Sequence, residues 1–91
     1  MREVSISAII PATLIARKAF YALGRSDVYT NNYRDCRTVK AYRTGSDIRD
    51  QQIINSIVKL VTEVGYKNVS AHLTESSNGY TLGAMIVRIP K

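Results

Sequence analysis

Apolar and polar residues alternate over residues 3–10, interrupted only at Ile9, and this period of two predicts a β-strand with one face on a core. Its apolar side would comprise Val4, Ile6, Ala8 and Ile10. The same period returns over residues 37–43, where Val39 and Ala41 point one way and Thr38, Lys40 and Tyr42 point the other. We therefore expect a second strand there. Between these segments, Val28 and Tyr29 fit a short strand within a stretch rich in turn-forming residues.

Two further segments space their apolar residues as a helix does. The first follows Pro11, which suits the first turn of a helix, and covers residues 12–23 up to Gly24. Its apolar stripe would comprise Ala12, Ile15, Ala19, Ala22 and Leu23. The second begins after a cap at Ser46 or Asp47 and ends at Gly65. Its wider stripe would comprise Ile53, Ile54, Ile57, Leu60, Val61 and Val64.

The last stretch predicts a hairpin, because Asn78-Gly79 is a strong signal for a two-residue turn. That turn would place Ser77 opposite Tyr80, Leu73 opposite Ala84, Ala71 opposite Ile86 and Val69 opposite Arg88. The core face would then comprise Val69, Ala71, Leu73, Leu82, Ala84 and Ile86. The other face would expose Met85, Val87 and Ile89, and we expect a homo-oligomer that assembles through this apolar strip. The alternative is that residues 25–36 fold over it.

The order of elements is β-α-(β)-β-α-β-β, and 91 residues form a single domain, 1–91. We expect an α+β fold in which two helices pack on one face of a small antiparallel sheet, and a ferredoxin-like variant also fits. One cysteine and one histidine exclude a disulfide framework and a cysteine-based metal cluster within one chain. We therefore expect no metal and no cofactor. The longest uncharged stretch, residues 4–16, is too short and too polar to cross a bilayer, so we expect a cytoplasmic protein with no membrane partner.

Positive charge is concentrated in the middle of the chain. Thirteen Lys and Arg against seven Asp and Glu give a net charge of +6, which favours an anionic partner. Residues 17–43 hold seven of these cations, only two acids and four of the six tyrosines. Arginine binds phosphate, tyrosine stacks on bases, and asparagine pairs with purine edges. The candidate ligand-binding residues are Arg25, Tyr29, Asn31, Tyr33, Arg34, Arg37, Lys40, Tyr42 and Arg43.

A solvated surface, whose tyrosines only cover the edge of the core, is the competing interpretation of this segment. The first turn after Pro11 is a further, weaker candidate for an anion site. No set of nucleophile, base and orienting residue stands out, and no glycine-rich phosphate loop is present. We therefore predict a binding protein and not an enzyme.

Residues 1–11 (MREVSISAIIP) and 19–33 (AFYALGRSDVYTNNY) resemble the small anti-defence proteins of tailed phages that sequester cyclic dinucleotides such as 3′,3′-cyclic GMP-AMP. The resemblance covers about the first third of the chain. It implies a non-catalytic nucleotide sponge, assembled as a homo-oligomer, that blocks anti-phage immunity in the host cytoplasm. The residue types by themselves indicate only an anionic ligand that carries nucleobases. They leave two alternatives open: a small basic DNA- or RNA-binding protein, and a phage inhibitor of a host protein.

Overall fold

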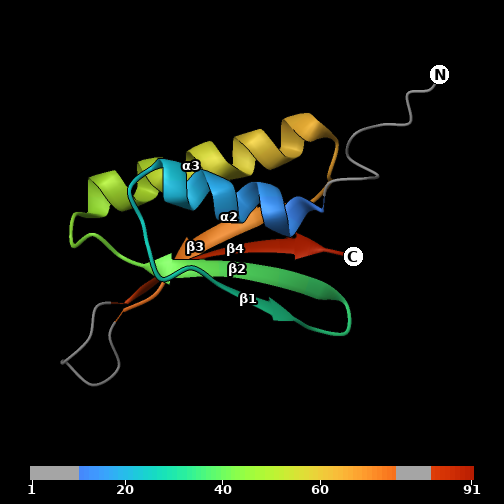
Figure 1. Cartoon of the computed structure of the whole chain (residues 1–91), viewed down its shortest axis with the longest axis horizontal. Coiled ribbons are helices and arrows are strands. Elements are labelled where there is room, and N and C mark those ends of the chain that lie inside the picture. The colour runs from blue at the N-terminus through green and yellow to red at the C-terminus, as the bar shows by residue number, and fades with distance from the viewer. Residues whose placement is uncertain (1–10, 76–82) are drawn as a thin grey trace.

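The computed structural model describes residues 11–75 and 83–91, which form one helical layer on one antiparallel sheet (Figure 1). The helices are α2 (Ala12–Ala22) and α3 (Asp47–Val64). The strands are β1 (Tyr29–Asn32), β2 (Cys36–Tyr42), β3 (Ser70–Leu73) and β4 (Ala84–Pro90), in the order β1-β2-β4-β3. The expected α+β fold, with both helices on one face, is confirmed. The expected strand over residues 3–10 and the Asn78-Gly79 turn lie outside the described residues.

Helix α3 forms where its caps and apolar stripe predict it. Ser46 is the N-cap, and its hydroxyl oxygen accepts a hydrogen bond from the Arg49 amide at 3.2 Å. Gly65 ends the helix with a φ of +126°, a left-handed conformation that favours glycine. The buried stripe matches the prediction at Ile53, Ile54, Ile57 and Val61, whereas Leu60 is exposed. No helix among the described residues is long and apolar enough to span a membrane.

Helix α2 begins where expected and ends at Ala22, one residue earlier than expected, and it turns a partly different face to the core. Its buried residues are Ala12, Ala16 and Phe20, while Ala22 and Leu23 of the expected stripe are exposed. Residues four apart lie on one face of a helix, and Phe20 has the largest apolar side chain in this segment. Burial of this ring therefore decides the rotation of the helix. Ile15 and Ala19 pack against the edge of the core.

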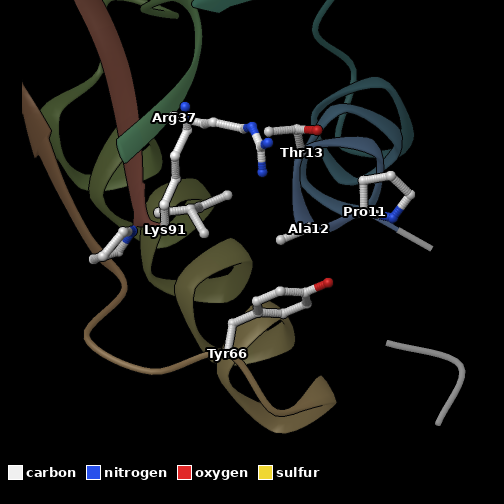
Figure 2. Close-up of a pocket in the computed structure, with 8 residues that line it drawn as sticks. Pro11, Ala12, Thr13, Arg37, Tyr66 and Lys91 are labelled. Atoms are coloured by element: carbon white, nitrogen blue, oxygen red, sulfur yellow. The ribbon is translucent and has the colours of Figure 1, made fainter. Parts of the chain in front are cut away.

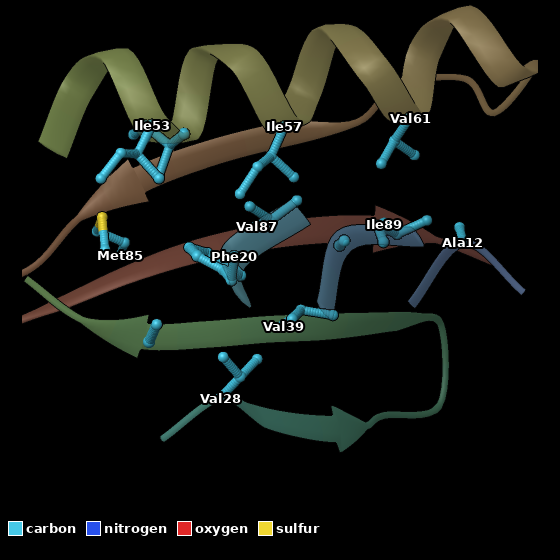
Figure 3. Close-up of a cluster of buried hydrophobic side chains, with 13 residues drawn as sticks. Ala12, Phe20, Val28, Val39, Ile53, Ile57, Val61, Met85, Val87 and Ile89 are labelled. Carbon is cyan, nitrogen blue, oxygen red and sulfur yellow. The ribbon is translucent and has the colours of Figure 1, made fainter. Parts of the chain in front are cut away.

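The β3–β4 pairing is shifted by one residue from the expected register. Leu73 pairs with Met85, and Ala71 pairs with Val87. Since successive side chains point to opposite faces of a sheet, this shift turns β4 over. Met85, Val87 and Ile89 face the helices with exposures of 0%, 0% and 4% (Figure 3). The exposed strip and the oligomer contact assigned to it are therefore wrong, because these three side chains fill the core of their own chain.

The β3–β4 ladder ends in a close approach of two backbones at Gly83. A Cβ atom built on Gly83 would lie 1.7 Å from the backbone oxygen of Thr74. Beside it, the Thr74 amide donates to the Ala84 carbonyl at 2.8 Å, and the Ala84 amide donates to the Thr74 hydroxyl oxygen at 2.8 Å. The chain thus requires glycine here, since any side chain would force the strands apart.

Both helices cover the same face of the sheet, and the core lies between the helices and the sheet (Figures 1 and 3). Strand β2 alternates as predicted, with Val39 and Ala41 buried on this inner side. No described helix covers the other side of the sheet, which we call the open face. Strand alternation and pairing place twelve residues on it. Cys36 and Pro90 form the pair at one end of β2 and β4, where Cys36 is buried. The other ten are Tyr29, Asn31, Thr38, Lys40, Tyr42, Ser70, His72, Ala84, Ile86 and Arg88.

Candidate functional site

The nine candidate ligand-binding residues divide into groups on different sides of the molecule. Four of them share the open face: Tyr29, Asn31, Lys40 and Tyr42. The other five lie elsewhere. Arg37 is on the inner side of β2, Arg43 directly follows β2, Tyr33 and Arg34 are in the β1–β2 turn, and Arg25 is in the connection from α2 to β1. The sequence segment is therefore not one site, and the open face holds the largest group.

Two rows of side chains cross all four strands on the open face. Directly paired residues define each row, and neighbouring strands lie about 4.8 Å apart, so each row spans roughly 14 Å. The first row, called the tyrosine row, reads Tyr29, Lys40, Ile86, His72. The second, called the polar row, reads Asn31, Thr38, Arg88, Ser70.

Lys40 and Arg88 form an unneutralised cation pair on this face. Lys40 pairs with Ile86, and Arg88 is the next residue of β4 on the same face, so the two cations are diagonal neighbours about 7–8 Å apart between Cα atoms. All ion pairs within the described residues belong to Arg43, and no strand residue placed on this face is acidic. Adjacent like charges repel each other. An anion bound between them would relieve that repulsion.

Two exposed tyrosine rings lie beside the cation pair. The centroids of Tyr29 and Tyr42 are 6.3 Å apart with an interplanar angle of 85°, an edge-to-face contact. The residues are 50% and 46% exposed, and Tyr29 pairs directly with Lys40. Tyr42, and after it Asp27, raise the pKa of the Tyr29 phenol above its ordinary value, so the ring stays neutral at physiological pH. The pair offers an aromatic surface for a planar ligand next to positive charge.

Arg43 is occupied by structural contacts. Its Nε donates to Oδ2 of Asp50 at 2.8 Å, Nη1 donates to Glu75 at 3.3 Å, and Nη2 donates to Asp47. The side chain is 8% exposed, and the carboxylate of Asp50 is fully buried. The guanidinium thus connects the end of β2 to the first turn of α3 and to Glu75, which follows β3. Because the side chain is so little exposed and its charge is already paired, Arg43 is a poor candidate for ligand binding.

Asp50 completes this buried cluster. Besides Arg43, it accepts hydrogen bonds on Oδ1 from the Thr44 amide at 2.8 Å and from the Thr44 hydroxyl at 2.7 Å. Burial by itself would raise the pKa of this carboxyl, but the donors of Arg43 and Thr44 stabilise the charged form. Together these hydrogen bonds outweigh the effect of burial, so the pKa of Asp50 lies below its ordinary value and the carboxyl group stays ionised.

Arg37 lines a cavity of about 310 Å³ on the inner side of the sheet. Figure 2 shows its side chain reaching toward Thr13 in the first turn of α2, with the Tyr66 ring across the cavity near Ala12. Ile89, Pro90 and Pro11 supply apolar wall, and Lys91 adds a second cation. The anion site expected at this helix start falls in the same place. The sheet separates this cavity from the open face.

The last three candidates lie away from the cation pair. Tyr33 and Arg34 are exposed in the β1–β2 turn, which closes with the Tyr33 amide donating to the Cys36 carbonyl at 2.8 Å. This turn is at the opposite end of β1 from Tyr29. Arg25 is half-buried, and its Nη1 donates to the Tyr42 carbonyl at 3.5 Å. These residues flank the sheet and do not complete the open-face cluster.

The predicted register missed the contribution of β4 to this face. His72 of β3 lies away from the core, as its alternation predicts, but Arg88 and Ile86 stand beside it only because of the observed register. The assumed register put Arg88 on the same side as the core residues of β4. A charged side chain there should have signalled the error, since an unpaired arginine is not buried in a small core.

Within the described residues, no group of three or more His, Cys, Asp or Glu could hold a metal ion. Cys36 is buried as a free thiol. Comparisons with family models, with curated proteins and with solved structures found no match for this chain.

Proposed function

We propose that this protein binds a phosphodiester-linked nucleotide on the open face and breaks no bond in it. The observation that carries the proposal is the unneutralised pair of Lys40 and Arg88 beside the exposed rings of Tyr29 and Tyr42. The two cations suit a phosphate, and the rings suit a base that stacks on them. The ligand thus needs both groups in one molecule, as a nucleotide has them.

A cyclic dinucleotide is the ligand that the sequence resemblance favours. Such a molecule is compact and carries two phosphates and two bases, so it matches the kinds of side chain gathered on the open face. Sequestering it would remove an immune signal of the host and so block anti-phage defence in the host cytoplasm. The homo-oligomer implied by the resemblance would need a contact surface other than Met85, Val87 and Ile89, which are buried.

Single-stranded DNA or RNA is the second candidate ligand. The tyrosine row and the polar row cross the whole described sheet, so a nucleic-acid chain bound at the cation pair could extend toward β1 or β3. The third possibility, an inhibitor that docks on a host protein, rested on the apolar strip of β4. Since that strip is inside the core, no described feature favours this alternative.

The salt dependence and the length dependence of binding distinguish the two ligands. Labelled 3′,3′-cyclic GMP-AMP and single strands of increasing length are titrated by fluorescence anisotropy at several salt concentrations. A cyclic dinucleotide has only two phosphates and gives a shallow slope, whereas the affinity of a polymer rises with length and falls by about 0.7 log units per contacted phosphate per decade of salt. If neither ligand binds, the proposed function is wrong.

Two substitutions on the face and one off it locate the site. Lys40→Gln removes half of the cation pair, and Tyr29→Leu removes the aromatic ring; both should weaken binding. Lys59→Gln is the matched control, because Lys59 is exposed on α3 in the opposite layer. An equal loss in both lysine variants would mean that binding follows net charge alone and would contradict an open-face site.

A further inference from the structure

We infer that the open face has a second base subsite at His72 and Ile86, so that the smallest ligand filling it is a base–phosphate–base unit. This inference rests on the proposed function. It follows from the order of side chains in the tyrosine row, where Lys40 has Tyr29 on one side and Ile86, then His72, on the other. The phosphate site therefore lies within the row, with a candidate surface for base stacking on each side of it.

The position of Arg88 also supports a phosphate site that lies between two base surfaces. Arg88 pairs with Ser70 on β3 and is therefore diagonal to His72, just as it is diagonal to Lys40 on β2. A phosphate held by Arg88 and Lys40 would lie between the tyrosine pair and His72. A single nucleotide placed on Tyr29 would reach the cations but would leave the β4–β3 side of the row uncovered.

The side chains on that flank have the chemistry of a base platform. His72 is exposed, and its imidazole ring is one of the flat side chains on which unpaired bases stack. Ile86 is half-buried next to it and is apolar, although its neighbours in the row are Lys40 and His72. A base laid over both would cover the apolar surface of Ile86 and stack on His72.

Two short adenine ligands test whether the second subsite exists. Adenosine 5′-monophosphate has one base and the larger charge, whereas the linear dinucleotide ApA has two bases and a single phosphodiester charge. If charge alone decided binding, the mononucleotide would bind more tightly. With two base subsites, ApA should bind at least about fivefold more tightly by calorimetric titration. Tighter or equal binding of the mononucleotide would overturn the second subsite.

Substitutions at His72 identify the place of the extra affinity. His72→Ala should reduce ApA binding by at least about fivefold and leave adenosine 5′-monophosphate binding unchanged, and His72→Phe should restore ApA binding through its ring. Thr62→Ala, at an exposed position of α3 in the helical layer, is the control and should change neither. If Thr62→Ala matches His72→Ala, or if His72→Phe does not restore binding, the stacking role of His72 is wrong.

The failure of this inference can be told apart from failure of the proposed function. If wild-type protein binds both ligands equally and Lys40→Gln weakens both, the face binds nucleotides but lacks the second subsite. If wild-type protein binds neither of these ligands nor the labelled cyclic dinucleotide and strands, the proposed function itself is wrong and the second subsite falls with it.

Discussion

Two cations near the end of β2, three residues apart, differ in how their charge is compensated. Arg43 directly follows β2, is buried against α3 on the inner side of the sheet, and contacts Asp50, Asp47 and Glu75. Lys40, on the open face of β2, forms no ion pair with any residue that the structure describes and is a diagonal neighbour of Arg88. A buried charge must be paired because its desolvation is expensive, whereas an exposed charge carries no such requirement. The comparison teaches that one short basic segment can hold a buried, paired cation and an exposed-face cation with a free charge three residues apart.

Removal of the inner cation should cause the largest effect. Arg43→Met leaves the buried carboxylate of Asp50 without its charged partner, so we expect the thermal midpoint to fall by at least about 10 °C. Lys40→Met makes the same replacement on the open face and should move the midpoint by less than about 3 °C. Thermal unfolding followed by circular dichroism measures both. Equal losses would mean that the two faces do not differ in the way described.

The turn of β4 into the core is tested by two adjacent substitutions. Val87→Thr buries a hydroxyl among apolar side chains and should cost about 1–3 kcal/mol of unfolding free energy. Ile86→Thr places the same residue on the open face, where water reaches the hydroxyl, and should cost clearly less. Urea denaturation measures the two values. A larger loss for Ile86→Thr would contradict the observed register. It would favour the register predicted from a two-residue turn at Asn78-Gly79, in which Ile86 faces the core.

The elements with redundant signals could be predicted from the sequence. Helix α3 has a serine cap, a glycine stop and apolar residues at helical spacing, and all three agree. The β3–β4 hairpin gives conflicting signals, because both alternating sets of β4 contain apolar residues: Ala84 and Ile86 on one side, Met85, Val87 and Ile89 on the other. Periodicity cannot choose between two such sets, and the Asn-Gly turn favoured the wrong one.

The candidate site was predicted only where strand alternation settled the face. Lys40 and Tyr42 were placed correctly on one side of β2, together and away from Val39 and Ala41. Arg43 could not be separated from them by composition, because its buried partner Asp50 lies across the connection into α3, seven residues on, and Glu75 is 32 residues distant in the chain. Pairing of this kind depends on tertiary structure, and neither the count of cations nor their spacing reveals it.

The protonation of Asp50 gives a smaller test of the inner face. Because the folded-state pKa of Asp50 lies below its ordinary value of 3.8, its ionised form stabilises the fold above about pH 3.8, and this contribution is lost as the pH falls through the folded-state pKa. Asp50→Asn cannot titrate, though its amide oxygen still accepts hydrogen bonds. The difference in thermal midpoint between wild type and Asp50→Asn should therefore shrink between pH 6 and pH 2. A difference that stays constant would contradict the lowered pKa.

Two arginines on opposite faces of the sheet give the finest comparison. Arg88 is on the open face beside Lys40, while Arg37 lines the inner cavity near α2. Arg88→Gln should weaken nucleotide binding by roughly fivefold and lower the salt slope by about 0.7, since one phosphate contact is lost. Arg37→Gln removes the same charge from the same chain and should change neither quantity. If Arg37→Gln has the larger effect, the ligand binds in the cavity of Figure 2, and the cations of the inner face are the ones that hold it.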